Sequence, residues 1–66
     1  MIKLEVTGMT CNHCVMAVTR ALQAVPGAER VEVSLERGEA QVEGEPDPAA
    51  LVRAVEEEGY QAQVVP

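Results

Sequence analysis

Residues 2–27, IKLEVTGMTCNHCVMAVTRALQAVPG, join a strand pattern to a helix pattern through a loop that carries both cysteines of the chain. Apolar and polar residues alternate over positions 2–7, which is typical of a half-buried strand. Apolar residues then recur at helical spacing over about 12–25, and Pro26-Gly27 would end that helix. The stretch therefore predicts a strand, a short cysteine-bearing loop and a helix.

A hairpin is predicted next. Apolar residues alternate with polar ones over 30–36, which indicates a second strand with Leu35 as its last apolar member. A third strand is expected around 40–42, and Arg37-Gly38 supplies a turn between the two. Two strands joined by so short a connection pair in antiparallel fashion.

A second helix and a last strand complete the pattern. Asp47 is predicted to cap the helix, with Pro48 in its first position and Gly59 as the left-handed residue that ends it. A short strand is expected around 62–65. The order β-α-β-β-α-β predicts an α+β fold with a four-stranded antiparallel sheet, both helices on one face, and a single domain over 1–66. The apolar stripe of the second helix is Leu51, Val52, Ala54 and Val55.

Composition narrows the possible functions. The chain has 66 residues, a net charge of −6, and Tyr60 as its only aromatic residue. An acidic chain without aromatic stacking platforms is not expected to bind nucleic acid. No apolar run is long enough to insert into a membrane, and no apolar signal region opens the chain, so we expect a cytoplasmic protein.

The cysteine pair carries the chemistry. Cys11 and Cys14 are the only cysteines, and they fall where the predicted loop becomes a helix. The free backbone N–H groups and positive dipole end of a helix start favour thiolate over thiol. Two neighbouring thiolates can bind a soft metal or exchange with a disulfide, and spacing alone leaves both open. A structural staple is disfavoured, because closing so short a loop contributes little stability.

The motif GMTCNHC at 8–14 resembles the heavy-metal-associated domain, and within that family the small bacterial copper chaperones. The resemblance continues over the whole chain, through Pro26-Gly27, Asp47-Pro48 and the Glu58-Gly59-Tyr60 segment. It implies a ferredoxin-like fold that binds one Cu(I) through the two cysteines.

The resemblance also implies partners. It implies transfer of the ion to the metal-binding domain of a copper-transporting P-type ATPase, with a copper-responsive repressor as a further candidate partner. We expect a carrier and not an enzyme, monomeric without metal, with a metal-bridged dimer left open. Cu(I) accepts two soft ligands, whereas Zn(II) usually takes four, which the motif alone cannot supply.

Four neighbours of the cysteines are candidates for supporting roles. Met9 could ligate copper, but the resemblance implies an inward side chain that packs beneath the loop. Thr10 or Asn12 is predicted to cap the helix, and His13 is expected to face solvent, with metal contact open only in a dimer. The resemblance places Tyr60 beside the metal, where it would shield the thiolates; the alternative is a plain core aromatic.

Other functions remain open on sequence grounds. A carrier of another soft or borderline metal (Zn, Hg or Ag) would use the same two sulfurs. A thiol–disulfide oxidoreductase would exploit a lowered thiol pKa, although the chain is short for a thioredoxin-like domain. Metal preference and thiol chemistry are therefore the properties to test.

Overall fold

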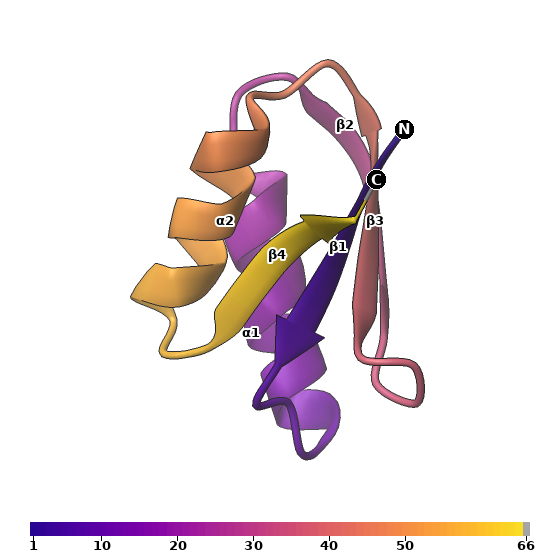
Figure 1. Cartoon of the computed structure of the whole chain (residues 1–66), viewed down its shortest axis with the longest axis vertical. Helices are drawn as coiled ribbons and strands as arrows, with labels where there is room; N and C mark the ends of the chain where they lie inside the picture. Colours follow the sequence, from indigo (N-terminus) through magenta and orange to yellow (C-terminus); the bar gives the residue numbers. More distant parts are fainter. Residues whose placement is uncertain (66) are drawn as a thin grey trace.

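Six elements follow one another in the predicted order in the computed structural model, which describes residues 1–65 (Figure 1). The predicted domain also includes Pro66, which lies outside the described residues. The elements are β1 (Ile2–Thr7), α1 (Asn12–Gln23), β2 (Ala28–Ser34), β3 (Glu39–Gly44), α2 (Pro48–Glu57) and β4 (Gln61–Val65).

The four strands form one antiparallel sheet in the order β2-β3-β1-β4. Both helices lie on the same side of this sheet, which confirms the predicted ferredoxin-like α+β fold (Figure 1). β1 and β4 are neighbours, with Thr7 opposite Gln61. This pairing brings the β1–α1 loop close to the segment that connects α2 to β4.

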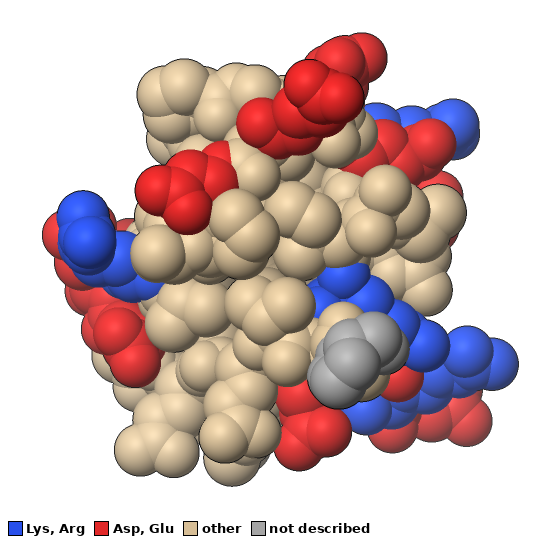
Figure 2. Space-filling model, turned by 45° about the horizontal axis from the view of Figure 1, so that its top comes forward, with Lys and Arg blue, Asp and Glu red and all other residues tan. Residues whose placement is uncertain are grey.

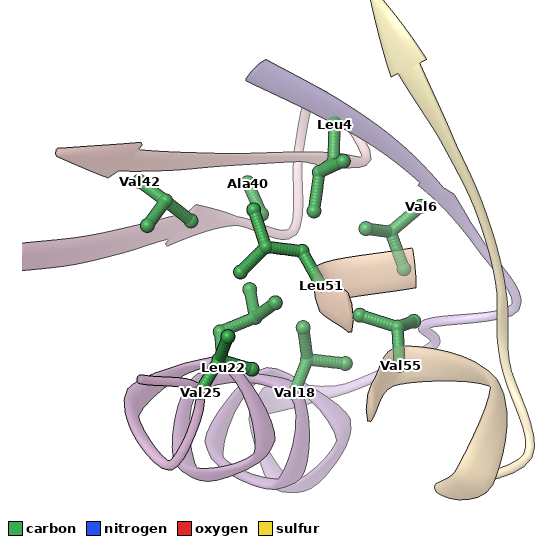
Figure 3. Close-up of a cluster of buried hydrophobic side chains, with 9 residues drawn as sticks. All are labelled: Leu4, Val6, Val18, Leu22, Val25, Ala40, Val42, Leu51 and Val55. Carbon is green, nitrogen blue, oxygen red and sulfur yellow. The ribbon is translucent and has the colours of Figure 1, made fainter. Parts of the chain in front are cut away.

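The hydrophobic core lies between the sheet and the helices. Side chains from β1, β3, α1 and α2 point toward one another there, with Leu51 in their midst (Figure 3). No polar or charged residue among those described is buried, so burial of apolar surface is the main stabilising contribution. The core residues are Leu4, Val6, Val18, Leu22, Val25, Ala40, Val42, Leu51 and Val55.

Two predicted helix ends are confirmed. The side chain of Asp47 accepts a hydrogen bond from the N–H of Ala49 at 3.1 Å, with Pro48 as the first helical residue. Gly59 has φ of +95° and donates its N–H to the carbonyl of Glu56 at 3.0 Å, as expected of the residue that ends α2.

Two local predictions were wrong. Leu35 is not part of the second strand: β2 ends at Ser34, and Leu35 lies at the start of the turn with an exposed side chain. The first helix is capped neither by Thr10 nor by Asn12, because its N-cap residue is Cys11 and Asn12 is already helical. Helical periodicity specifies which residues share a face and leaves the first residue of the helix open.

A close backbone approach shapes the corner that precedes α2. Gly44 has φ of +112°, and a Cβ there would collide with the carbonyl oxygen of Gly27. The N–H of Glu45 donates to the same carbonyl at 3.2 Å. Glycine at position 44 is therefore required both by its backbone angle and by space.

Within residues 1–65, no helix has the length and apolar character needed to cross a membrane.

Candidate metal centre

Cys11 stands at the start of α1 with its sulfur free. Its backbone is extended (φ −159°, ψ 173°), and its carbonyl oxygen accepts hydrogen bonds from the N–H groups of Cys14 (3.0 Å) and Val15 (3.3 Å). The side chain makes no capping hydrogen bond. Cys11 thus begins the helix through its backbone alone, which leaves an exposed thiol available for another ligand.

The two thiols lie side by side. The Sγ atoms of Cys11 and Cys14 are 3.9 Å apart, and both cysteines are free. A metal–thiolate bond measures ~2.3 Å in zinc sites, so one ion can contact both sulfurs without a change in the fold. The i, i+3 relation on the first helical turn produces this proximity.

Hydrogen bonds hold Cys14 in its thiolate form. They lower the pKa of Cys14 from 9.0 to about 6, with the largest contribution from the backbone of Thr10, followed by the hydroxyl groups of Tyr60 and Thr10. Partial desolvation opposes them. Residues 8–19 include no Lys, Arg, Asp or Glu, so the thiolate is stabilised by dipoles and not by an ion pair.

Thr10 contacts the site directly. Its Oγ1 lies 3.8 Å from the Sγ of Cys14, within hydrogen-bond range for sulfur. The sequence pattern predicts a role for Thr10 in the loop or the helix cap and does not anticipate this contact. Thr10 lies in the loop before the N-cap residue Cys11, so this contact depends on the loop conformation and not on helical spacing.

Tyr60 reaches the site from the far end of the chain. Its hydroxyl interacts with Cys14, and this interaction, aided by burial and by the charges of Cys14, Cys11 and Glu58, raises the pKa of Tyr60. Tyr60 therefore stays protonated, and its hydroxyl stabilises the charged sulfur of Cys14. A Cβ on Gly8 would lie 3.3 Å from the Tyr60 ring, so the ring covers the β1–α1 loop at the position where that loop leaves the sheet.

Met9, His13 and Met16 differ in how far they are buried. Met9 is half-buried and packs against the hydrophobic core, in agreement with the expected inward position. His13 is exposed, as expected. Met16 is 54% exposed on α1. Over residues 1–65 no group of three or more His, Cys, Asp or Glu side chains is placed to hold a metal ion.

Comparisons with known proteins agree with this geometry. The family model of the heavy-metal-associated domain matches residues 3–61, and the chain belongs to that family. The copper chaperone CopZ of Enterococcus hirae is 35% identical over 66 residues, which is 96% of each chain. Copper-transporting ATPase 2 of Rhizobium meliloti is 43% identical over 61 residues, which is 89% of this chain but 7% of the ATPase.

Solved structures show the same fold. The apo copper chaperone of Enterococcus hirae superposes with a TM-score of 0.91 at 32% identity, covering 98% of this chain and 100% of that one. Oxidised MerP from Ralstonia metallidurans superposes with a TM-score of 0.92 at 31% identity, covering 98% and 94%. This chain thus shares its fold with a protein whose name does not mention copper as well as with a copper chaperone.

Proposed function

We propose that this chain binds one Cu(I) through Cys11 and Cys14 and delivers it by ligand exchange to the metal-binding domain of a copper-transporting P-type ATPase. The observation that carries the proposal is the pair of free thiols 3.9 Å apart, with the pKa of one lowered to about 6. Thiolate sulfur is the ligand that Cu(I) prefers, and two such ligands satisfy it.

The site suits a transferable ion. Cys11 is exposed and, among the described residues, has no side-chain hydrogen-bond partner other than Cys14, whereas Cys14 is held by Thr10 and Tyr60. An incoming thiolate can therefore approach from the Cys11 side and form a three-coordinate intermediate. Cys11 would leave first and Cys14 last, so the ion is never released to water.

The low pKa of Cys14 favours the same order of metal binding and release. At pH 7 a thiol with a pKa of about 6 is about nine-tenths ionised, so Cys14 needs to lose no proton when it binds the metal. It also leaves as a thiolate, without a proton from solvent. In this proposal the chain is a carrier and not an enzyme, because no bond of a substrate other than the metal–sulfur bonds changes.

The supporting residues have distinct roles in this proposal. Thr10 and Tyr60 hold the Cys14 thiolate, and Tyr60 also shields it from competing thiols. Met9 supports the loop from the core side. His13 faces solvent and contacts metal only in a metal-bridged dimer.

The cellular setting is part of the proposal. Both thiols must be reduced to bind the ion, so the proposal places the chain in a reducing compartment such as the cytoplasm. Family membership with copper chaperones and ATPase domains supports the ATPase as recipient. A copper-responsive repressor is a second recipient of the same ion.

Mercury is the second candidate cargo. The 42% identity over 66 residues to a mercuric reductase of Serratia marcescens, of which this chain spans 14%, supports Hg(II), and oxidised MerP is a further relative that is not named for copper. Both ions are soft and use the same two sulfurs. They differ in charge: with two thiolates Cu(I) leaves a net charge of −1 at the site, whereas Hg(II) leaves none.

Anaerobic metal titration tests the assignment. Cu(I), Hg(II) and Zn(II) are each added to reduced protein in competition with a chromophoric chelator. We expect one Cu(I) per monomer, and loss of tight binding in Cys11→Ser and Cys14→Ser, since a hydroxyl is a hard and mostly protonated ligand. Tight Cu(I) binding that survives Cys14→Ser would reject the site, and transfer of Hg(II) but not Cu(I) to a purified ATPase domain would reject the cargo.

A further inference from the structure

The two edges of the sheet are unequally protected. β2 and β4 each pair with one neighbour only. β2 carries Glu29, Arg30 and Glu32 and has an irregularity in its register with β3, features that discourage pairing with another chain. β4 has the sequence QAQVV, without a charged residue, and its register with β1 is regular. Of the four strands described, only β4 lacks a charge.

The register shows which backbone groups of β4 face outward. The N–H of Val6 donates to a carbonyl oxygen of the β2–β3 turn at 2.7 Å, so Val6 faces β3. Backbone groups alternate in direction along an antiparallel strand, so Glu5 faces β4, where it lies opposite Gln63. Gln63 is therefore bonded to β1. The residues on either side of it, Ala62 and Val64, direct their N–H and C=O groups away from the sheet.

Within residues 1–65 these outward groups have no hydrogen-bond partner. No loop, turn or side chain bonds to the backbone of Ala62 or Val64 on its outer side. The side chain of Val64 is 44% exposed, which is unusual for a residue on the helix-facing side of the sheet. The outward backbone groups of Ala62 and Val64 can therefore bond to an added strand, and the side chain of Val64 can pack against it.

A groove beside this edge carries two carboxylates and no basic side chain, and Lys3, opposite Val65, is paired with Glu39. The groove runs along β4 between the open face of the sheet and α2, and it is lined by Glu5, Thr7, Glu56, Gln61, Ala62 and Gln63. The net charge of the whole chain is −6. On the face shown in Figure 2, Asp and Glu side chains and Lys and Arg side chains both border an uncharged central area. A second copy at this edge would bring its own Glu5 and Glu56 toward those of the first, whereas a basic segment would be attracted.

We propose that the outer edge of β4 binds an extended segment of a partner protein that carries Lys or Arg, by addition of a fifth strand to the sheet. The N–H and C=O groups of Ala62 and Val64 supply the backbone hydrogen bonds, and Glu5 and Glu56 select for positive charge. This interaction goes beyond the proposed metal transfer, because neither cysteine takes part in it. Its test can succeed or fail whether or not the chain carries copper.

The probe is a short synthetic peptide in which lysine alternates with valine, added to metal-free reduced protein and followed by amide NMR. We expect shift changes along β4 and slower hydrogen exchange at Ala62 and Val64, whose N–H groups become bonded. The same peptide with glutamate in place of lysine should not bind. This measurement requires no substitution in the protein.

Variants separate the backbone from the charge contribution. Val64→Pro removes the outward N–H and leaves the bonds to β1 intact, so it should fold and weaken binding about tenfold or more. Val64→Thr keeps the N–H and the size and should bind like the parent. Glu56→Gln should weaken binding about two- to fivefold at low salt, whereas Glu32→Gln on the opposite edge should not.

Three results would overturn the proposal. One is peptide binding that Val64→Pro leaves unchanged while its circular dichroism matches that of the parent. Another is a set of shift changes confined to elements other than β4. The third is self-association of the protein alone that Val64→Pro abolishes, which would make a second copy the occupant.

Discussion

The lowered pKa of Cys14 is the most direct physical prediction of the structure. At pH 7 a thiol with a pKa of about 6 is about nine-tenths ionised, whereas one that kept the ordinary 9.0 would be about one-hundredth ionised. The folded protein should thus hold about ninetyfold more thiolate at Cys14 than an unfolded chain does. Tyr60→Phe and Thr10→Val each remove one hydroxyl group that stabilises the Cys14 thiolate. Both should raise the pH midpoint at which Cys14 ionises.

The order of the two effects follows from the contacts. The hydroxyl of Tyr60 contributes more than that of Thr10, and the largest contribution comes from the backbone of Thr10, which Thr10→Val retains. We therefore expect the midpoint to rise more in Tyr60→Phe than in Thr10→Val, with both remaining below 9.0. The assay is ultraviolet thiolate absorbance of metal-free reduced protein against pH under anaerobic conditions.

Single cysteine variants show which sulfur gives the change in thiolate absorbance. Cys14→Ser should lose the transition at about pH 6, whereas Cys11→Ser should keep one near there. A transition that persists in Cys14→Ser would show that the thiolate had been assigned to the wrong sulfur. An unchanged midpoint in Tyr60→Phe would show that the ring packs without its hydroxyl reaching Cys14.

The same shift makes stability depend on pH. The pKa of Cys14 is lower in the folded protein than in the unfolded chain, so the folded state binds the proton less tightly. The stabilisation is complete above about pH 9, declines as the pH falls from 9 toward 6, and is lost below 6. Urea unfolding of the apo protein should show this slope, and Cys14→Ser should lack it.

Three further predictions concern the scaffold and its loop. Leu51→Ala, at a fully buried position, should cost about 2–5 kcal/mol in the free energy of unfolding, comparable to the ~3–5 kcal/mol that a core this small supplies, so chemical unfolding should find it largely unfolded. Gly44→Ala should destabilise far more than Gly38→Ala, whose added Cβ meets its nearest atom at 3.2 Å; equal melting temperatures would contradict the collision with Gly27. His13→Ala should change monomeric Cu(I) affinity by less than about tenfold, or roughly 1.4 kcal/mol, in a chelator competition at dilute protein concentration.

Local patterns were enough to predict most of the fold. Alternation and helical spacing predict the order of the elements, because each depends on which face of one element meets the core. Asp47 and Gly59 mark helix ends because their preferences arise from local backbone geometry. The same alternation predicts a strand position for Leu35, which is wrong because the pattern cannot show where pairing with β3 stops.

The candidate site was predicted less completely. Cys11 and Cys14 stand out by spacing alone, and the structure places their sulfurs together. The hydroxyl contacts of Thr10 and Tyr60 with Cys14 were not derivable from the residue pattern, since one depends on loop geometry and the other on strand register. Resemblance to a known family placed Tyr60 near the metal, but only the folded chain shows which sulfur it reaches.

The pairing of β1 with β4 links the metal loop to the rest of the fold. Thr7 lies opposite Gln61, so the residue after β1 and the residue before β4, Gly8 and Tyr60, necessarily meet. A slip of β4 by one position would turn Ala62, which packs against the core, to the open face of the sheet and bring the polar Gln61 and Gln63 to the helix side. The core thereby favours this register, the register places Tyr60 beside the metal loop, and Tyr60 adds the second-largest contribution, after the Thr10 backbone, to the lowered pKa of Cys14.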